Sequence, residues 1–148
     1  MRIKPSWLLG CLFAAGLIIH LDASSAPATD IQVKDAWIRW LPADIPAGGY
    51  VTLINTATVD RVLVAVTSPA FGEVGIHQTL DDHGVSTMRS VESVTLKPRV
   101  PFRFMEGGYH LMLMQPVRPI HPGDAVVMTF RFSQGAPVDI VFKVRASN

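Results

Sequence analysis

The segment "AVVMTFRFSQGAPVDIVFKV", residues 125–144, decides the fold class, because apolar and polar side chains alternate along both of its halves. In the first half, Met128, Phe130 and Phe132 occupy every second position. Residues 138–144 repeat the pattern, with aliphatic and aromatic side chains separated by charged ones. Successive side chains of a β-strand point to opposite faces, so this period of two predicts two strands, each with one buried face.

The rest of the chain has a similar composition from about residue 31 onward. Further runs rich in β-branched and aromatic residues are residues 31–40, 49–56, 61–68, 73–79, 85–90, 101–105 and 109–115. Segments typical of turns, such as "PADIPAGG", "LDDHG" and "HPGD", separate these runs. No window of helical length has apolar residues at i, i+3, i+4 and i+7 without an interrupting Pro or Gly. The sequence therefore predicts an all-β domain, either an antiparallel sandwich or a Greek-key barrel.

The first 28 residues have the layout of a secretory signal peptide. A basic start at residues 2–4 precedes an apolar run at residues 7–19, and small residues follow. The apolar run is too short to span a membrane comfortably. We expect cleavage after Ser25 or after Ala28, so that residues 29–148 form one exported domain without stable membrane contact.

Two other interpretations of this N-terminal segment remain open. The leader could stay uncleaved and act as a membrane anchor. The run Leu8-Leu9-Gly10-Cys11 also has a faint similarity to a lipoprotein cleavage box, although few apolar residues precede Cys11 and the apolar run continues beyond it. Cys11 is the only cysteine, so a chain cleaved near residue 28 has no disulfide. Its fold must then depend on core burial, which about 120 residues can supply in one domain.

The charge pattern and the absence of catalytic motifs exclude several classes of function. Beyond residue 28 the chain has 11 Lys and Arg residues and 11 Asp and Glu residues, with no basic block. Nucleic acid and anionic membranes are therefore poor candidate partners. The sequence contains no Gly-x-Ser-x-Gly elbow and no phosphate-binding loop, and we expect a protein that is not an enzyme.

A second segment, "GGYHLMLMQP" at residues 107–116, places unusual side chains on one strand face. If this segment is extended, His110 and Met112 share a face, and leucines occupy the opposite face. Met114 continues the first face one step further along, where we expect it to pack or shield. A hairpin through "LDDHG" would also bring together the strands that carry His77 and Met88.

The resulting set has the spacing His77-x10-Met88-x21-His110-x-Met112. Imidazole and thioether groups are poor ligands for Mg²⁺ and Ca²⁺, and thioethers are unusual for Zn²⁺. Soft, uncharged sulfur favours Cu(I), and a thioether cannot form a disulfide in an oxidising compartment. No carboxylate lies within the motif, which argues against a catalytic metal site. An electron-transfer cupredoxin would need a cysteine ligand, which the mature chain lacks.

This four-residue pattern, with "GGYHLMLM" around its second half, resembles that of the PCu(A)C family of periplasmic copper chaperones. The resemblance extends from about Ala36 to Val144, through "AWIR", "GGYVTLINT", "LVAVTSP" and "VTLKP". It implies a cupredoxin-like (Ig-like) Greek-key β-sandwich that binds one Cu(I) per chain in the periplasm. It also implies delivery to the CuA centre of cytochrome c oxidase, alongside Sco-type proteins. The implied ligands are His77, Met88, His110 and Met112, while Gln78 departs from the Met or Glu of many relatives.

Two alternative functions remain open, namely a periplasmic copper storage or resistance protein and a metal-free secreted binding module. In a metal-free module the histidines and methionines would only be buried. The remaining side chains of interest have structural expectations. We expect a monomer in which Met105 and Met128 lie in the core and His83 and His121 are solvated. Trp37 and Trp40 are expected to pack.

Overall fold

The computed structural model describes residues 29–42 and 45–147, and the expected signal peptide lies outside them. The strands are β1 (Ile31–Trp40), β2 (Ala47–Asn55), β3 (Arg61–Thr67), β4 (Phe71–Asp82), β5 (Val85–Ser90), β6 (Val94–Leu96), β7 (Pro101–Phe104), β8 (Tyr109–Pro116), β9 (Ala125–Phe132) and β10 (Val138–Ala146). Among the described residues, no helix is long and apolar enough to cross a membrane. Every strand expected from the sequence is present. Only β6 was missed, because three residues are too few to show alternation.

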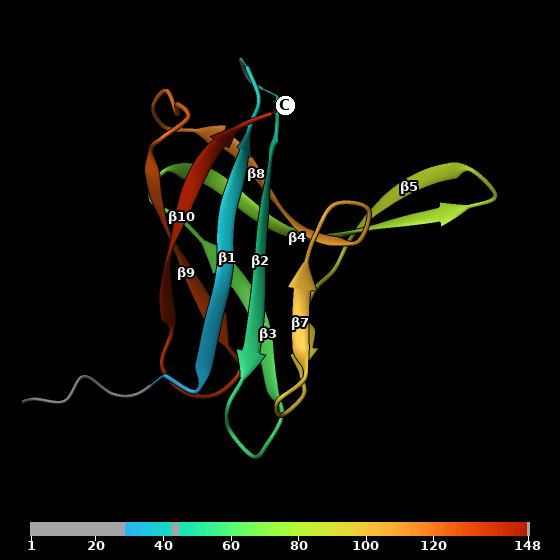
Figure 1. Cartoon of the computed structure of the whole chain (residues 1–148), viewed down its shortest axis with the longest axis vertical. Coiled ribbons are helices and arrows are strands. Elements are labelled where there is room, and N and C mark those ends of the chain that lie inside the picture. The colour runs from blue at the N-terminus through green and yellow to red at the C-terminus, as the bar shows by residue number, and fades with distance from the viewer. Residues whose placement is uncertain (1–28, 43–44, 148) are drawn as a thin grey trace, which may run out of the picture.

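The strands form one continuous sheet in the order β5-β4-β8-β2-β1-β10-β9-β3-β6, and β7 pairs with β2 beside β8. The sheet folds over on itself, with β1, β2 and β10 in front of β3 in Figure 1. Neighbouring strands are antiparallel except for β1 and β10, which pair in parallel. The predicted cupredoxin-like or Ig-like β-sandwich is therefore confirmed, with the first and last strands joined side by side.

The core lies between the two layers and is built from the alternating positions that the sequence shows. The buried face of β10 consists of Val138, Ile140, Phe142 and Val144. The rings of Phe142 and Phe130 stack with their centroids 6.1 Å apart. Met128 is fully buried, as expected.

The expectation that Met105 belongs to the core is wrong, because its side chain is 54% exposed. Met105 lies between β7 and β8, just beyond the last core-facing residue of β7. In Figure 1 the loop that follows β7 lies to the side of the sandwich body.

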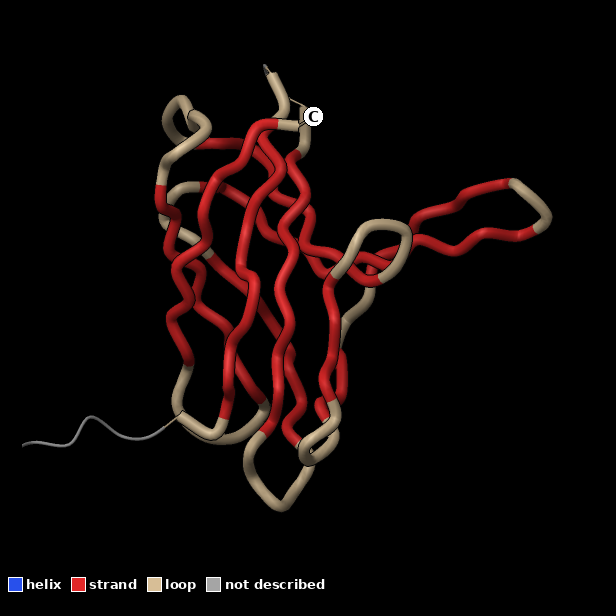
Figure 2. Tube along the Cα trace, in the orientation of Figure 1, coloured by secondary structure: helices blue, strands red, loops and turns tan. Residues whose placement is uncertain are grey.

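Strands β4 and β5 form a hairpin that projects from the body of the sandwich (Figures 1 and 2). The hairpin predicted through "LDDHG" is confirmed, with His77 opposite Ser90 and Thr79 opposite Met88. All six residues of β5 are exposed. The far end of β4 thus leaves the core and holds an exposed edge strand beside it.

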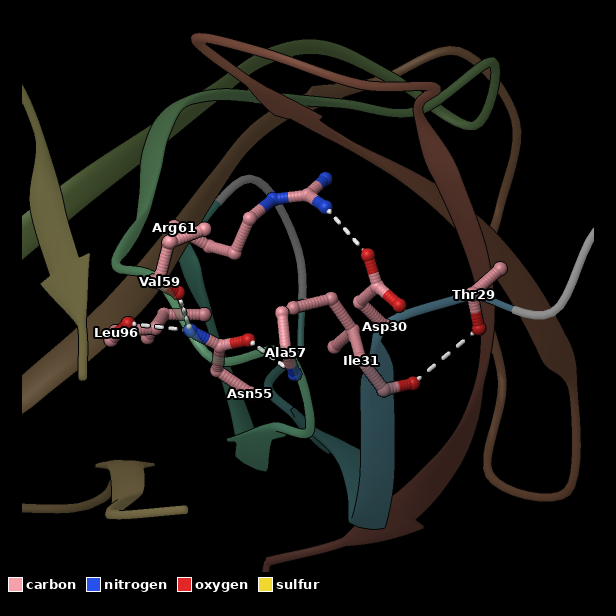
Figure 3. A network of polar contacts seen from close by, with 8 residues as sticks. All are labelled: Thr29, Asp30, Ile31, Asn55, Ala57, Val59, Arg61 and Leu96. Atoms are coloured by element: carbon pink, nitrogen blue, oxygen red, sulfur yellow. Dashed lines mark hydrogen bonds and ion pairs between the residues drawn. The ribbon is translucent and has the colours of Figure 1, made fainter. Parts of the chain in front are cut away.

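A buried asparagine fixes the loop that follows β2 (Figure 3). The Asn55 side-chain amide donates hydrogen bonds to the carbonyl oxygens of Val59, at 2.8 Å, and Leu96, at 2.9 Å. Its side-chain oxygen accepts a hydrogen bond from the Ala57 amide at 3.0 Å. Asn55 therefore joins the loop after β2 to strand β6 and satisfies its polar atoms without water.

Candidate metal centre

The centre of the candidate site is strand β8, which lies between β4 and β2. His110 is the cross-strand partner of His77 on β4. Met112 has a glycine on each side, Gly75 on β4 and Gly48 on β2. Leu111 and Leu113 point the other way, into the core. The sheet therefore brings His77, His110 and Met112 together on its outer face, while the opposite face of β8 holds the strand in the fold.

The two histidines of this face are close neighbours. Their ring centroids lie 6.1 Å apart and the rings are tilted by 33°. His110 is only 8% exposed, and its Nδ1 lies 3.1 Å from the carbonyl oxygen of Gly108. A carbonyl oxygen can only accept a hydrogen bond, so Nδ1 carries the proton. In the neutral ring Nε2 then keeps a free lone pair, the arrangement by which proteins orient a metal-binding histidine.

His77 differs from His110 in how its ring is held. Its Nδ1 is buried and has no hydrogen-bond partner within the part of the chain that the structure describes. Burial lowers the pKa of His77 from its ordinary value, and the neighbouring His110 lowers this pKa further, against an opposing contribution from Glu73. His77 is therefore kept neutral, the protonation state that a metal requires. A buried, unpaired imidazole nitrogen is costly unless a ligand completes it.

Met112 lies in a slot between two rings, because neither of its glycine neighbours has a side chain. A Cβ atom on Gly75 would come within 2.7 Å of His77 Nε2. A Cβ atom on Gly48 would come within 2.5 Å of the Tyr50 hydroxyl oxygen. The His77 ring therefore leans over Gly75, and the Tyr50 ring leans over Gly48. The two rings therefore approach Met112 on β8 from opposite sides.

Met88, the fourth predicted ligand, lies at the edge of this cluster. It is opposite Thr79 on β4, two residues beyond His77, so it shares the outer face with His77 at a diagonal position. Its side chain is 52% exposed, whereas that of His110 is buried. The structure thus brings three predicted ligands together across β4 and β8 and places the fourth on the projecting hairpin.

The other side chains considered from the sequence lie outside this cluster. Met114 continues the outer face of β8, opposite Glu73. Gln78 belongs to the other face of β4, where its side-chain oxygen accepts a 2.8 Å hydrogen bond from Arg89. His83 is exposed at the hairpin tip beside Asp82, and His121 is exposed in the loop before β9.

Tyr50 and Trp37 were not identified as part of the site from the sequence. Their rings lie 4.7 Å apart at the centroids, and Tyr50 is a buried residue of the outer face. The guanidinium groups of Arg145 and Arg39 lie over Trp37 and Tyr50, at 5.2 Å and 5.7 Å from the ring centroids. Arg39 also forms an ion pair with Glu106. The available signal was the alternation in "GGYV", which puts Gly48 and Tyr50 on one face.

The donor set determines what this centre can bind. Within residues 29–42 and 45–147, no three His, Cys, Asp or Glu side chains gather as a possible metal group. The candidate donors are instead two neutral imidazoles and two thioethers. Soft, uncharged donors of this kind suit a soft ion of low charge better than a hard divalent cation. The unpaired His77 nitrogen and the oriented His110 ring both fit such a ligand.

Comparison with known proteins gives the family. The LpqE-like family model matches residues 31–144. A relative from Leifsonia xyli subsp. xyli, the candidate lipoprotein Lxx21020, is 28% identical over 138 residues, which cover 88% of this chain and 81% of the relative. The match therefore includes nearly every strand of the domain, from β1 to β10.

Solved structures share the fold. The copper-bound PCuAC domain of PmoF2 superposes with a TM-score of 0.67 and 24% identity, covering 80% of this chain and 95% of that domain. The apo form of the same domain superposes with a TM-score of 0.65 and 26% identity, covering 80% of this chain and 91% of that domain. The Cu(I) form of DR1885 from Deinococcus radiodurans superposes with a TM-score of 0.62 and 24% identity, covering 83% of this chain and 81% of DR1885. The chain belongs to the LpqE-like family and has the fold of the PCuAC domains.

Proposed function

We propose that this protein is an extracytoplasmic copper chaperone that holds one Cu(I) ion per chain and passes it to an acceptor protein. The ligands in this proposal are His77, Met88, His110 and Met112. The observation that carries it is the cross-strand pair of His77 and His110 with Met112 beside it. Three neutral, soft or borderline donors meet there on one face, in a chain whose residues 29–148 contain no cysteine.

The exposure of the site supports transfer of the ion rather than permanent storage. His110 is buried, whereas Met88 stands half-exposed on a hairpin that projects from the body. An acceptor could therefore approach the ion from the hairpin side and replace Met88 first. Because all four ligands are neutral, the ion would leave without separating an ion pair, and the electrostatic reorganisation would be small.

The similar structures support copper as the cargo. The PmoF2 domain is described as copper-bound and DR1885 as a Cu(I) form, and both share this fold. We infer that this chain uses the same architecture for the same ion. For the acceptor we propose the apo CuA domain of cytochrome c oxidase or a Sco-type copper protein. The periplasm is the proposed compartment, in keeping with the lipoprotein relatives and the leader expected from the sequence.

The deciding test is titration of the exported protein with Cu(I) against a competing chromophoric chelator. One equivalent should bind, and a Met88→Leu/Met112→Leu double variant should fold yet bind much more weakly. A folded wild-type protein that never competes with the chelator would instead favour a metal-free binding module.

A second assay separates a chaperone from a storage or resistance protein. The copper-loaded protein is mixed with an apo CuA domain, and the CuA absorbance is followed after oxidation. A chaperone should lose its copper to the acceptor, whereas a storage protein should retain it.

A further inference from the structure

The two histidines of the site are held in different ways. His110 is oriented by the hydrogen bond from its Nδ1 to the Gly108 carbonyl oxygen. Among residues 29–42 and 45–147, the buried Nδ1 of His77 has no such hydrogen bond. Something other than a hydrogen bond must therefore determine where the His77 ring lies before any ion binds.

The backbone at Gly75 forms the surface on which this ring rests. Gly75 and His77 are two residues apart on β4, so both face outward. A Cβ atom on Gly75 would lie 2.7 Å from His77 Nε2 and 3.0 Å from its Cδ2, and it would meet no other heavy atom within 4 Å. Real Cβ atoms essentially never approach other atoms so closely. Any side chain at position 75 would therefore exclude the ring from its present place.

We propose that Gly75 is a positioning residue of the metal site, because its missing side chain lets the His77 imidazole lean along β4 toward Met112. Met112 is the direct cross-strand partner of Gly75, so the space above Gly75 lies immediately beside the thioether strand. The inference rests on the proposed copper function, and it adds a residue that contacts no ion.

The clash at position 75 would be relieved by the ring and not by the backbone. Both atoms that a Cβ would meet belong to the far end of the His77 side chain, which has no hydrogen bond to lose. A Gly75→Ala variant should therefore fold normally and displace only the imidazole. Alanine is also less flexible than glycine in the unfolded chain, which offsets part of any cost to folding.

Gly72 offers a matched control on the same strand. A Cβ atom there would come within 2.8 Å of the side-chain oxygen of Gln115 and 3.1 Å of its Cβ, at a site away from the histidines. Gly72→Ala therefore adds a methyl group that Gln115 must make room for, on the same strand but away from the two histidines.

The first measurement needs no copper. In the exported, metal-free protein, NMR should show nuclear Overhauser contacts between the His77 ring protons and the α-protons of residue 75. Gly75→Ala should lose the contact between ring and α-proton, and Gly72→Ala should keep it. An unchanged contact in Gly75→Ala would overturn the proposal whether or not the protein binds copper.

The second measurement is Cu(I) affinity by chelator competition. Gly75→Ala should weaken binding roughly 10–100-fold, the usual effect of losing the support of a metal ligand. Gly72→Ala should bind as the wild type does. In a His77→Ala background, adding Gly75→Ala should cause no further loss, because the ring is already absent. A full additional loss in that background, or wild-type affinity in Gly75→Ala alone, would overturn the assignment. If the wild type itself binds no Cu(I), the copper function fails and the NMR contact alone decides the role of Gly75.

Discussion

The imidazole rings of His77 and His110 are cross-strand partners on β4 and β8, with centroids 6.1 Å apart. A proton on either ring would place a positive charge beside the other ring. Burial around His77 opposes that charge as well. The pKa of His77 is therefore lowered, which favours its neutral ring beside His110 on the outer face. One soft metal cation can accept a lone pair from each of the two rings, whereas one proton binds to only one of them.

The stability of the metal-free protein should depend on pH through His77. Its pKa in the fold lies below the ordinary value of 6.5, so the unfolded chain takes up a proton first as the pH falls. The contribution of His77 is therefore fully present above about pH 6.5 and is lost as the pH falls toward the lowered pKa. Urea unfolding between about pH 5 and pH 7.5 should show this loss, and His77→Gln should remove it.

Cu(I) affinity should also fall with pH, because protons compete for both imidazoles. Because the pKa of His77 is lowered, the decrease should extend below about pH 6.5 and approach two protons taken up per ion released. His110→Ala should reduce this dependence by about one proton. Chelator competition with ascorbate present measures the slope, and a flat profile would contradict a site with two histidine ligands.

Replacing Met112 by leucine separates a ligand from a packing residue. The change nearly conserves volume, so it should cost less than about 1.5 kcal/mol of stability. If Met112 binds the ion, Cu(I) affinity should fall sharply in a folded protein. Met114→Leu is the matched control on the same face, opposite Glu73, and its effect should be much smaller. Equal losses in the two variants would mean that the site extends further along β8.

Met88 allows a cleaner test, because its side chain is 52% exposed and packs little. Met88→Leu should change the free energy of unfolding by no more than about 0.5 kcal/mol, as is usual at the surface. Weaker Cu(I) binding in this variant could then be attributed only to the lost thioether. Copper affinity equal to that of the wild type would remove Met88 from the ligand set.

Asn55 should be important for the stability of the fold and should not affect copper binding. Its side chain is fully buried and makes three hydrogen bonds, to Val59, Leu96 and Ala57. Asn55→Ala leaves these buried backbone groups unpaired, which should cost roughly 2–4 kcal/mol. Denaturant unfolding gives the loss, and Cu(I) affinity of the folded fraction should not change. A loss of Cu(I) affinity as large as that of Met112→Leu would contradict the view that the metal site is independent of the Asn55 hydrogen bonds.

The mass of the exported protein should identify how its N-terminus is processed. We expect a chain that begins just after Ser25 or Ala28, without Cys11. A mass that includes lipid on Cys11 would show processing as a lipoprotein, and a mass that includes residues 1–28 would show a retained anchor.

The sequence alone determined which side chains share a face within each strand. His110 and Met112 were placed together because side-chain direction in a strand alternates locally, whatever the rest of the fold does. The same reasoning gave the buried faces of β9 and β10. The β4–β5 hairpin was also predictable, since a short turn fixes which two strands meet. The prediction that Met105 is buried was wrong, because its run of apolar residues ends in a turn, where alternation no longer predicts burial.

Only the tertiary structure decided which faces come together. Strand β8 pairs with β4 and β2, which are distant in sequence, and this pairing sets His77 opposite His110 and Gly75 opposite Met112. Likewise, a bulge between Lys34 and Trp37 turns Trp37 outward toward Tyr50, while Trp40 donates its indole N–H to the Ile120 carbonyl oxygen. Strand order and register depend on how all the apolar faces pack into one core. That is a property of the whole chain, and no local pattern of residues contains it.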